Sequence, residues 1–322
     1  MHAIEVRNHG GPEELKYVEV PDPSPSGGEM LVRTTAIGVN FIDVYFRTGI
    51  YPTELPYIPG SEATGVVEDP NGAEGFSTGD RVVWATAPSS YAELVCVPAT
   101  AAIPVPDGAS DAVAASALLQ GMTAHYLINS VYPVRSGDTI LVHAGAGGVG
   151  QVLTQLAVAK GAEVITTVST DAKADLSRQA GATHVLRYGP NLSRQVRDLT
   201  DGEGVAAVFD GVGKDTFDAS LDSVRVRGTV ALFGAASGPV PAFDPQRLNK
   251  AGSVFLARPS LGHFVRTRDE LLWRAGDVLD AIAEGSLTIQ VGAEYPLRDA
   301  EQAHRDLEGR MTTGSIVLLP GE

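Results

Sequence analysis

Thr139-Ile140-Leu141-Val142-His143-Ala144-Gly145-Ala146-Gly147-Gly148-Val149-Gly150 is the stretch of sequence that decides the fold. It begins as an apolar run typical of a buried strand, continues as a glycine-rich turn and leads into a helical pattern over 149–160. Glycines let the backbone approach a bound phosphate, and the helix that follows offers free N–H groups and the positive end of its dipole. A turn that binds nothing can also be rich in glycine, but strand, turn and helix stand here in the order that a dinucleotide fingerprint requires. The sequence therefore predicts a dinucleotide against Gly147, Gly148 and Val149.

Strand and helix patterns alternate from Gln120 onward. We expect strands at 139–143, 163–168, 184–187, 205–209, 229–233 and 253–257, and helices at 149–160 and 172–180. Six strands at this spacing are typical of a doubly wound parallel sheet with helices on both faces.

The chain before this region is rich in β-strand patterns. Short apolar runs at 30–37, 63–68, 81–84 and 91–98 lie between clusters of glycine, proline and aspartate. Such regular spacing predicts a small barrel or sandwich. After the α/β region, an amphipathic segment at 267–284 leads to a β-like tail at 315–320, which we expect to return to the first domain.

Composition restricts the classes of protein that this chain can belong to. The 322 residues are 43% hydrophobic and 20% charged, as in a globular enzyme, and carry a net charge of −15. That charge disfavours nucleic acid and anionic membranes as partners. The single cysteine, Cys96, rules out an internal disulfide and a zinc site with several cysteines. Without an apolar N-terminal core or a long apolar run, the chain is expected to be a soluble cytoplasmic protein.

The end of the second strand of the α/β region bears on which dinucleotide binds. An NAD site usually places an acid there to bind the ribose 2′-hydroxyl, whereas this chain has Thr167-Val168-Ser169-Thr170. Ser169, Lys173 and Tyr188 can together bind a 2′-phosphate. Asp171 is a competing candidate for the missing acid, and we interpret it instead as a helix N-cap. The pattern therefore predicts NADPH.

Five segments, together spread over most of the chain, carry a family resemblance. They are residues 9–13 (HGGPE), 38–45 (GVNFIDVY), 59–63 (PGSEA), 120–126 (QGMTAHY) and 258–261 (RPSL). With them the chain resembles the zinc-free quinone oxidoreductases, a zeta-crystallin-like branch of the medium-chain dehydrogenase/reductase superfamily. The resemblance implies a GroES-like β-barrel catalytic domain at 1–119 and 262–322, a Rossmann domain at 120–261, NADPH as cofactor and a homodimer.

The resemblance also implies that no metal is used. In zinc-dependent relatives a cysteine and a histidine hold the catalytic metal, and Asn40 and Ser61 stand at those two positions here. The loop with four cysteines that holds a structural zinc in such relatives is missing from this sequence. We therefore expect no metal ligands.

By resemblance, further residues are expected at the reaction site. Asn40 and Tyr45 would line the nicotinamide and the substrate, and Tyr51 would bind the acceptor oxygen, unless it is only a packing aromatic. The remaining cofactor contacts would be Thr123 beneath the nicotinamide, Phe233 and Gly234 at its carboxamide, Arg258 and Ser260 closing over the cofactor, and Arg310 near the tail. A surface salt bridge is the alternative role for Arg310. The sequence identifies no general acid.

These expectations lead to one main function and several alternatives. The main function is NADPH-dependent reduction of a quinone, by hydride or one-electron transfer. An enoyl or 2-alkenal reductase that acts on α,β-unsaturated carbonyls would use the same motifs. An RNA-binding or structural, crystallin-like role is a weaker alternative, and the acidic net charge disfavours RNA.

Overall fold

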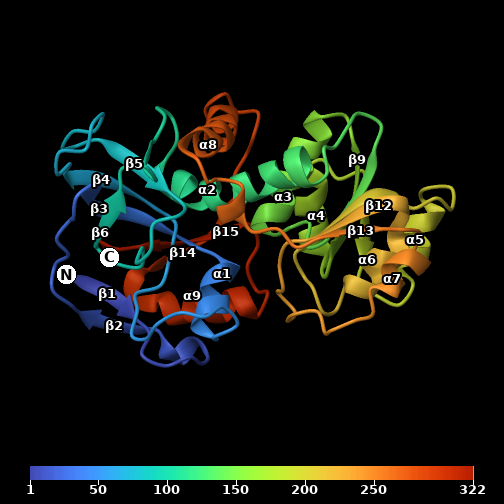
Figure 1. Cartoon of the computed structure of the whole chain (residues 1–322), viewed down its shortest axis with the longest axis horizontal. Coiled ribbons are helices and arrows are strands. Elements are labelled where there is room, and N and C mark those ends of the chain that lie inside the picture. The colour runs from blue at the N-terminus through green and yellow to red at the C-terminus, as the bar shows by residue number, and fades with distance from the viewer. Residues whose placement is uncertain (322) are drawn as a thin grey trace. The chain divides into compact units, whose positions relative to one another are not determined.

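The computed structural model describes residues 1–321 (Figure 1). These residues fold into two compact units. One comprises Met1–Gln120 together with the segment from Val265 to the C-terminus, and the other comprises Gly121–Phe264. Helix α2 (Asp111–Tyr126) contains the point at which the chain passes from the first unit to the second.

The second unit is built on a parallel sheet with the strand order β10-β9-β8-β11-β12-β13. Its strands are β8 (Thr139–Val142), β9 (Glu163–Val168), β10 (His184–Arg187), β11 (Val205–Asp210), β12 (Val224–Leu232) and β13 (Phe255–Ala257). The order reverses between β8 and β11. Ligands of doubly wound sheets bind at the carboxyl ends of the strands beside such a reversal, where the glycine-rich turn follows β8.

Helices cover both faces of this sheet (Figure 1). They are α3 (Gly148–Ala159), α4 (Asp171–Gln179), α5 (Leu192–Asp198), α6 (Phe217–Ser223) and α7 (Gln246–Lys250). Side chains of β9 alternate between the two faces of the sheet, so each face can bury apolar residues against helices. Ile165 packs with residues of α5 and α6, and Val168 packs with Ala174 of α4. The predicted doubly wound sheet is confirmed.

The main difference from the sequence prediction concerns β12, which begins at Val224 instead of Thr229. Its pairing with β11 shifts register between Val205 and Ala207, and Arg227 has a left-handed φ of 57°. Residues 224–228 form an irregular extension of the strand. Arg225 and Arg227 are exposed there, so this part of the sequence lacks the apolar run that predicts a strand.

The first unit contains a mainly antiparallel sheet with the order β14-β15-β3-β4-β5-β7, and β6 also pairs with β3. The strands are β3 (Glu29–Val39), β4 (Ala63–Asp69), β5 (Arg81–Trp84), β6 (Leu94–Pro98), β7 (Ile103–Pro104), β14 (Val291–Pro296) and β15 (Ser315–Leu319). A separate hairpin joins β1 (His2–Glu5) to β2 (Lys16–Glu19). The predicted return of the tail is confirmed, because β15 pairs antiparallel with β3 (Figure 1).

The helices of the first unit are α1 (Phe41–Arg47), α8 (Arg268–Ala283) and α9 (Ala300–Glu308), with the N-terminal part of α2. Helix α8 begins at a capping box in which Thr267 accepts from the Glu270 N–H, as expected for a Thr-x-x-Glu pattern. Large side chains such as Trp84 and Tyr91 are fully buried in the core of this unit. Among residues 1–321 no helix is both long enough and apolar enough to cross a bilayer.

Candidate functional site

The glycine-rich turn of the second unit is tightly folded. The Gly147 N–H donates to the Ala144 carbonyl at 2.9 Å, and the Gly145 N–H donates to the Thr167 carbonyl at 3.0 Å. Gly147 is the N-cap of α3. A Cβ on Gly150 would lie 2.3 Å from the Ala144 carbonyl oxygen, so the turn can close only with glycine there. The first N–H groups of α3 have no acceptor within the helix and suit a phosphate.

His143 joins the turn to the neighbouring strands through a buried chain of hydrogen bonds. Its Nδ1 lies 2.8 Å from Thr167 Oγ1 and its Nε2 lies 3.1 Å from Ser220 Oγ. The Ser220 hydroxyl donates to the Asp210 carboxylate at 2.7 Å. Burial lowers the pKa of His143. A neutral imidazole therefore ties β8 to β9 and α6, a role beyond the strand end that the sequence indicated.

The edge predicted to select the 2′-phosphate is formed by the ends of adjacent strands. Val168 and Arg187 are paired in β9 and β10, so Ser169 and Tyr188 directly follow paired residues. The Tyr188 hydroxyl accepts from the Ala144 N–H at 2.9 Å, which places this side chain at the glycine-rich turn. Lys173 lies in the first turn of α4, beside the same edge.

The interpretation of Asp171 as a helix N-cap is wrong. Thr170 is the N-cap of α4, because its backbone is extended and its hydroxyl accepts from the Lys173 N–H at 3.3 Å. Asp171 is the first helical residue, is exposed and pairs with Arg187. Its carboxylate suits the positive end of the helix dipole at this position.

The other candidates of the second unit lie near the ends of β12 and β13 and on α2. Phe233 follows β12, and its carbonyl accepts from Arg258 Nη1 at 3.2 Å, so the structure brings these two candidates together. Gly234 is buried, and a Cβ there would lie 2.5 Å from the Gly211 carbonyl oxygen. Ser260 is exposed after β13, and Thr123 is a buried residue of α2.

In the first unit, Asn40 belongs to a buried chain of polar side chains. Its Nδ2 donates to Glu62 Oε2 at 2.7 Å, and its Oδ1 accepts from Gln120 Nε2 at 3.2 Å. The second oxygen of Glu62 accepts from the Leu119 N–H at 2.6 Å, and Ser315 Oγ donates to Gln120 Oε1 at 2.8 Å. Asn40 is only 6% exposed and Glu62 is 0% exposed.

A second buried cluster lies beside this chain, around Asp43. Asp43 Oδ2 accepts from the Asn40 N–H at 2.9 Å and from the Tyr91 hydroxyl at 3.0 Å. The Tyr91 oxygen also lies 3.1 Å from His304 Nε2. Burial raises the pKa of Asp43 to about 7 and lowers that of His304 to about 3.

Glu62 is the residue that the sequence reasoning missed. Burial raises its pKa to about 8, and the nearby charge of Asp43 contributes to the rise. Glu62 and Asp43 both lie within the segments that carry the family resemblance, 59–63 and 38–45. An acid inside such a segment was the available signal, but only the packing shows that both are buried.

The remaining candidates of the first unit are placed as follows. Tyr45 is buried, and its ring packs edge-on against Tyr51 with centroids 5.3 Å apart. Tyr51 also packs against Phe46 at 5.6 Å, so its ring is held in an aromatic cluster. Arg310 is exposed just after α9, with a left-handed φ of 56°.

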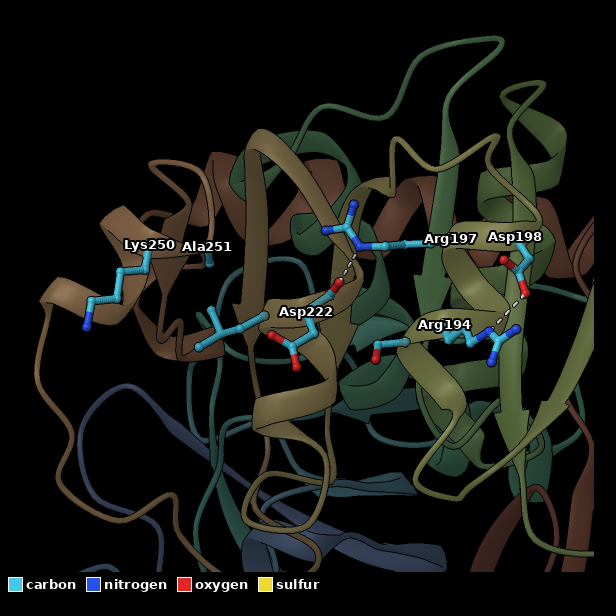
Figure 2. A pocket seen from close by; sticks show the side chains of 8 residues that line it. Arg194, Arg197, Asp198, Asp222, Lys250 and Ala251 are labelled. Carbon is cyan, nitrogen blue, oxygen red and sulfur yellow. Dashed lines mark hydrogen bonds and ion pairs between the residues drawn. The ribbon is translucent and has the colours of Figure 1, made fainter.

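A pocket in the second unit contains none of the candidate residues. Figure 2 shows that it lies over α5, α6 and α7, with basic and acidic side chains around it. Arg197 donates from Nε to the Asp222 carbonyl at 2.8 Å, and Arg194 lies 3.9 Å from Asp198. The first contact joins α5 to α6 and the second lies within α5, and we assign no ligand to this pocket.

The family resemblance implies that Asn40 and Ser61 stand where zinc-dependent relatives carry metal ligands. Asparagine and serine are not among the side chains that usually bind zinc in proteins. In the described residues, 1–321, no group of three or more His, Cys, Asp or Glu side chains is arranged to hold a metal ion.

The pH dependence of stability tests the burial of Glu62. The folded chain keeps this proton up to about pH 8, whereas a free glutamate ionises near 4.5, so the unfolded chain releases the proton first. The stability that protonated Glu62 contributes is therefore fully present below about pH 4.5 and is lost as the pH rises toward 8. From pH 6.5 to 8.5, above the normal pKa of histidine, we expect Glu62 to lower the free energy of unfolding by about 2 kcal/mol.

Urea unfolding at pH 6.5 and 8.5 measures this effect. The Glu62→Gln variant should lose less stability over the interval than the wild type does, because glutamine does not titrate. Glu74→Gln is the matched control at an exposed site, and it should follow the wild type. Equal slopes for wild type and Glu62→Gln would contradict the raised pKa.

Comparison with known proteins places both units in described families. Residues 26–107 match the family described as alcohol dehydrogenase GroES-like domain, and residues 148–271 match the family described as zinc-binding dehydrogenase. Quinone oxidoreductase of Pseudomonas aeruginosa is 42% identical over 322 residues, covering 98% of this chain and 99% of the relative. 2-Haloacrylate reductase of a Burkholderia species is 40% identical, covering 99% of this chain and 98% of the relative.

Solved structures are similar over nearly the whole chain. A mycobacterial protein complexed with NADPH has a TM-score of 0.98 at 58% identity, covering 99% of this chain and 100% of that chain. Escherichia coli quinone oxidoreductase complexed with NADPH has a TM-score of 0.97 at 39% identity, with the same coverage.

Proposed function

The chain belongs to the zinc-free quinone oxidoreductase branch of the medium-chain dehydrogenase/reductase superfamily, and on this basis we propose that it is an NADPH-dependent quinone reductase. The first unit is its GroES-like catalytic domain and the second its Rossmann domain. The observation that carries the proposal is that Ser169 and Tyr188 follow paired strand ends and that the Tyr188 hydroxyl bonds the glycine-rich turn, with Lys173 in the first turn of α4. This edge offers a cation and hydroxyl groups where an NAD site has a carboxylate.

The residues of the second unit fit NADPH in three ways. The N-terminus of α3 and the close packing at Gly150 form a cradle for the pyrophosphate. Ser169, Lys173 and Tyr188 would hold the 2′-phosphate. Arg258, fastened to the Phe233 carbonyl, would close over the cofactor with Ser260.

When bound, NADPH supplies a hydride from the nicotinamide C4. Quinones accept this hydride readily because their conjugated system delocalises the negative charge that develops. The protein then has to orient the acceptor and keep water out. We assign the orientation of the acceptor to Asn40, Tyr45 and Tyr51. Thr123 would contact the nicotinamide from beneath, Gly234 its carboxamide, and Arg310 would be a further cofactor contact. The proton that completes the reduction comes from solvent.

A panel of acceptors tests the proposed function. Initial rates of NADPH oxidation are measured with a series of quinones and a series of α,β-unsaturated carbonyls. We expect kcat/KM to be highest for a quinone. Faster turnover of an enone than of every quinone would instead favour the alternative, an enoyl or 2-alkenal reductase, which the similarity to 2-haloacrylate reductase supports.

We also propose that the protein is a cytoplasmic homodimer and binds neither nucleic acid nor membranes. Family resemblance supports the dimer, and the net charge of −15 supports the absence of polyanionic partners. Light scattering during size-exclusion chromatography measures the mass of the particle and so tests the dimer. RNA filter binding at modest salt, with and without NADPH, tests the second, and saturable retention of RNA would contradict it.

A further inference from the structure

The buried imidazole of His143 is held at both of its ring nitrogens. Its Nδ1 lies 2.8 Å from Thr167 Oγ1, in β9, and its Nε2 lies 3.1 Å from Ser220 Oγ, in α6. Both partner side chains are fully buried, and a hydroxyl can either donate or accept. The two hydroxyls therefore fix the plane of the ring whichever nitrogen carries the hydrogen.

The Ser220 side of this arrangement is itself anchored. The carboxylate of Asp210, at the end of β11, accepts from the Ser220 hydroxyl at 2.7 Å. The other carboxylate oxygen accepts from the Val212 N–H and the Gly213 N–H, each at 2.9 Å. The ring of His143 is thus tied through Ser220 to the backbone of the loop that follows β11.

One face of the His143 ring lies against Tyr188. The ring centroids are 6.1 Å apart and the planes differ by 19°, as in an offset-stacked aromatic pair. Tyr188 directly follows β10, which pairs with a neighbouring strand on one side only. The Tyr188 hydroxyl accepts from the Ala144 N–H at 2.9 Å. The side chain is therefore placed at its oxygen by the glycine-rich turn and at its ring by His143.

The effect of His143 on a bound phosphate has to pass through another residue. Burial lowers the pKa of His143, so its ring is uncharged and brings no cation to the phosphate site. Tyr188, in contrast, carries an O–H group, which can donate to a phosphate oxygen while its oxygen accepts from the backbone. NADH has no 2′-phosphate, so the placement of this hydroxyl affects NADPH more than NADH.

We propose that His143 is a positioning residue whose ring face holds Tyr188 at the 2′-phosphate and so contributes to the preference for NADPH over NADH. This inference rests on the proposed function, in which Ser169, Lys173 and Tyr188 hold that phosphate. A stacked aromatic pair stabilises less than a charge-assisted contact does, so the expected loss of preference is about threefold to tenfold.

Three variants of His143 separate the ring face from the hydrogen bonds. His143→Leu and His143→Phe both lose the bonds to Thr167 and Ser220, but only phenylalanine keeps an aromatic face. His143→Gln has no ring, and its amide can bond the Ser220 hydroxyl. Fluorescence titration at one ionic strength gives the ratio of the NADH and NADPH dissociation constants for each variant. Urea unfolding checks that each variant is folded.

We expect this ratio to fall about threefold to tenfold in His143→Leu and His143→Gln, and to return to within about twofold of the wild type in His143→Phe. Val196→Ala is the control outside this network, because it removes part of a buried apolar side chain of α5. It should lower the urea midpoint and leave the ratio unchanged. A wild-type ratio in either variant without a ring, or an equal loss in His143→Phe, would overturn the proposal.

A double-mutant cycle with Tyr188→Leu tests whether His143 acts through Tyr188. In the Tyr188→Leu background, His143→Leu should change the ratio less than about twofold, because the contact is already lost. The same loss in both backgrounds would overturn the inference. Similar affinities of the wild type for NADPH and NADH would defeat the proposed 2′-phosphate site and the inference with it. Absence of quinone turnover would defeat the proposed function alone, because the cycle measures binding.

Discussion

Replacing Gly150 by alanine is expected to lower the affinity for NADPH at least about 100-fold, because the loss of two or more charge-assisted hydrogen bonds has this effect. The added Cβ would lie 2.3 Å from the Ala144 carbonyl oxygen and 3.0 Å from the Gly145 Cα. Both neighbours are backbone atoms and cannot turn away as a side chain could. The turn must open, and the N–H groups of α3 move away from the pyrophosphate. Fluorescence titration with NADPH measures the loss.

Gly147→Ala separates phosphate binding from folding. The nearest protein atom to a Cβ there is the Ala144 carbonyl oxygen at 3.3 Å, and the φ of −79° suits alanine. We expect this variant to unfold at the wild-type urea concentration but to bind NADPH more weakly. Gly276→Ala in α8 is the control, because nothing outside the helix lies within 4 Å of its added Cβ. Wild-type NADPH affinity in both turn variants would contradict the assignment of the phosphate site.

Lys173→Ala is expected to weaken NADPH binding about tenfold to 100-fold and to leave NADH binding nearly unchanged. Lys173 lies in the first turn of α4, beside the end of β9, and the proposed contact is to the 2′-phosphate. NADH lacks that phosphate and so loses nothing. The dissociation constants of NADPH and NADH are measured for wild type and variant at one ionic strength. Their changes show how much affinity each cofactor loses.

Lys160→Ala is the matched control. This lysine is exposed at the C-terminal end of α3, whereas the glycine-rich turn precedes the N-terminal end of that helix. It should leave both dissociation constants unchanged. Similar affinities of the wild type for NADPH and NADH, or equal losses for both cofactors in Lys173→Ala, would contradict the proposed 2′-phosphate site.

Most strands of the second unit could be predicted because each is a short apolar run between turn residues. The predicted bounds 163–168 and 184–187 are those of β9 and β10. The strand was predicted to begin at Thr229, but β12 begins at Val224. The residues in between include the exposed Arg225, Val226 and Arg227, which break the apolar run. The N-cap of α4 was misplaced by one residue because Thr170 and Asp171 are both good capping residues, and only the backbone conformation distinguishes them.

Some residues of the candidate site could be predicted from the sequence and others could not. Ser169 and Tyr188 could be predicted from spacing, since the ends of adjacent parallel strands meet at one edge of a sheet. Glu62 could not, because a glutamate in a sequence is most often exposed. Its hydrogen bond to Asn40 joins residues that are 22 positions apart in the sequence.

The sequence by itself determined the order of strands and helices and the glycine-rich turn. It also placed asparagine at 40 and serine at 61, where the family resemblance implies the zinc ligands of zinc-dependent relatives. These features depend on residue types and short spacings, which are local. Only the tertiary structure decided that Glu62 and Asp43 are buried, that Tyr188 reaches the turn, and that Asn40 lies between Glu62 and Gln120. The physical reason is that the loss of water around a carboxyl group, and the partners that replace it, depend on which distant segments pack together.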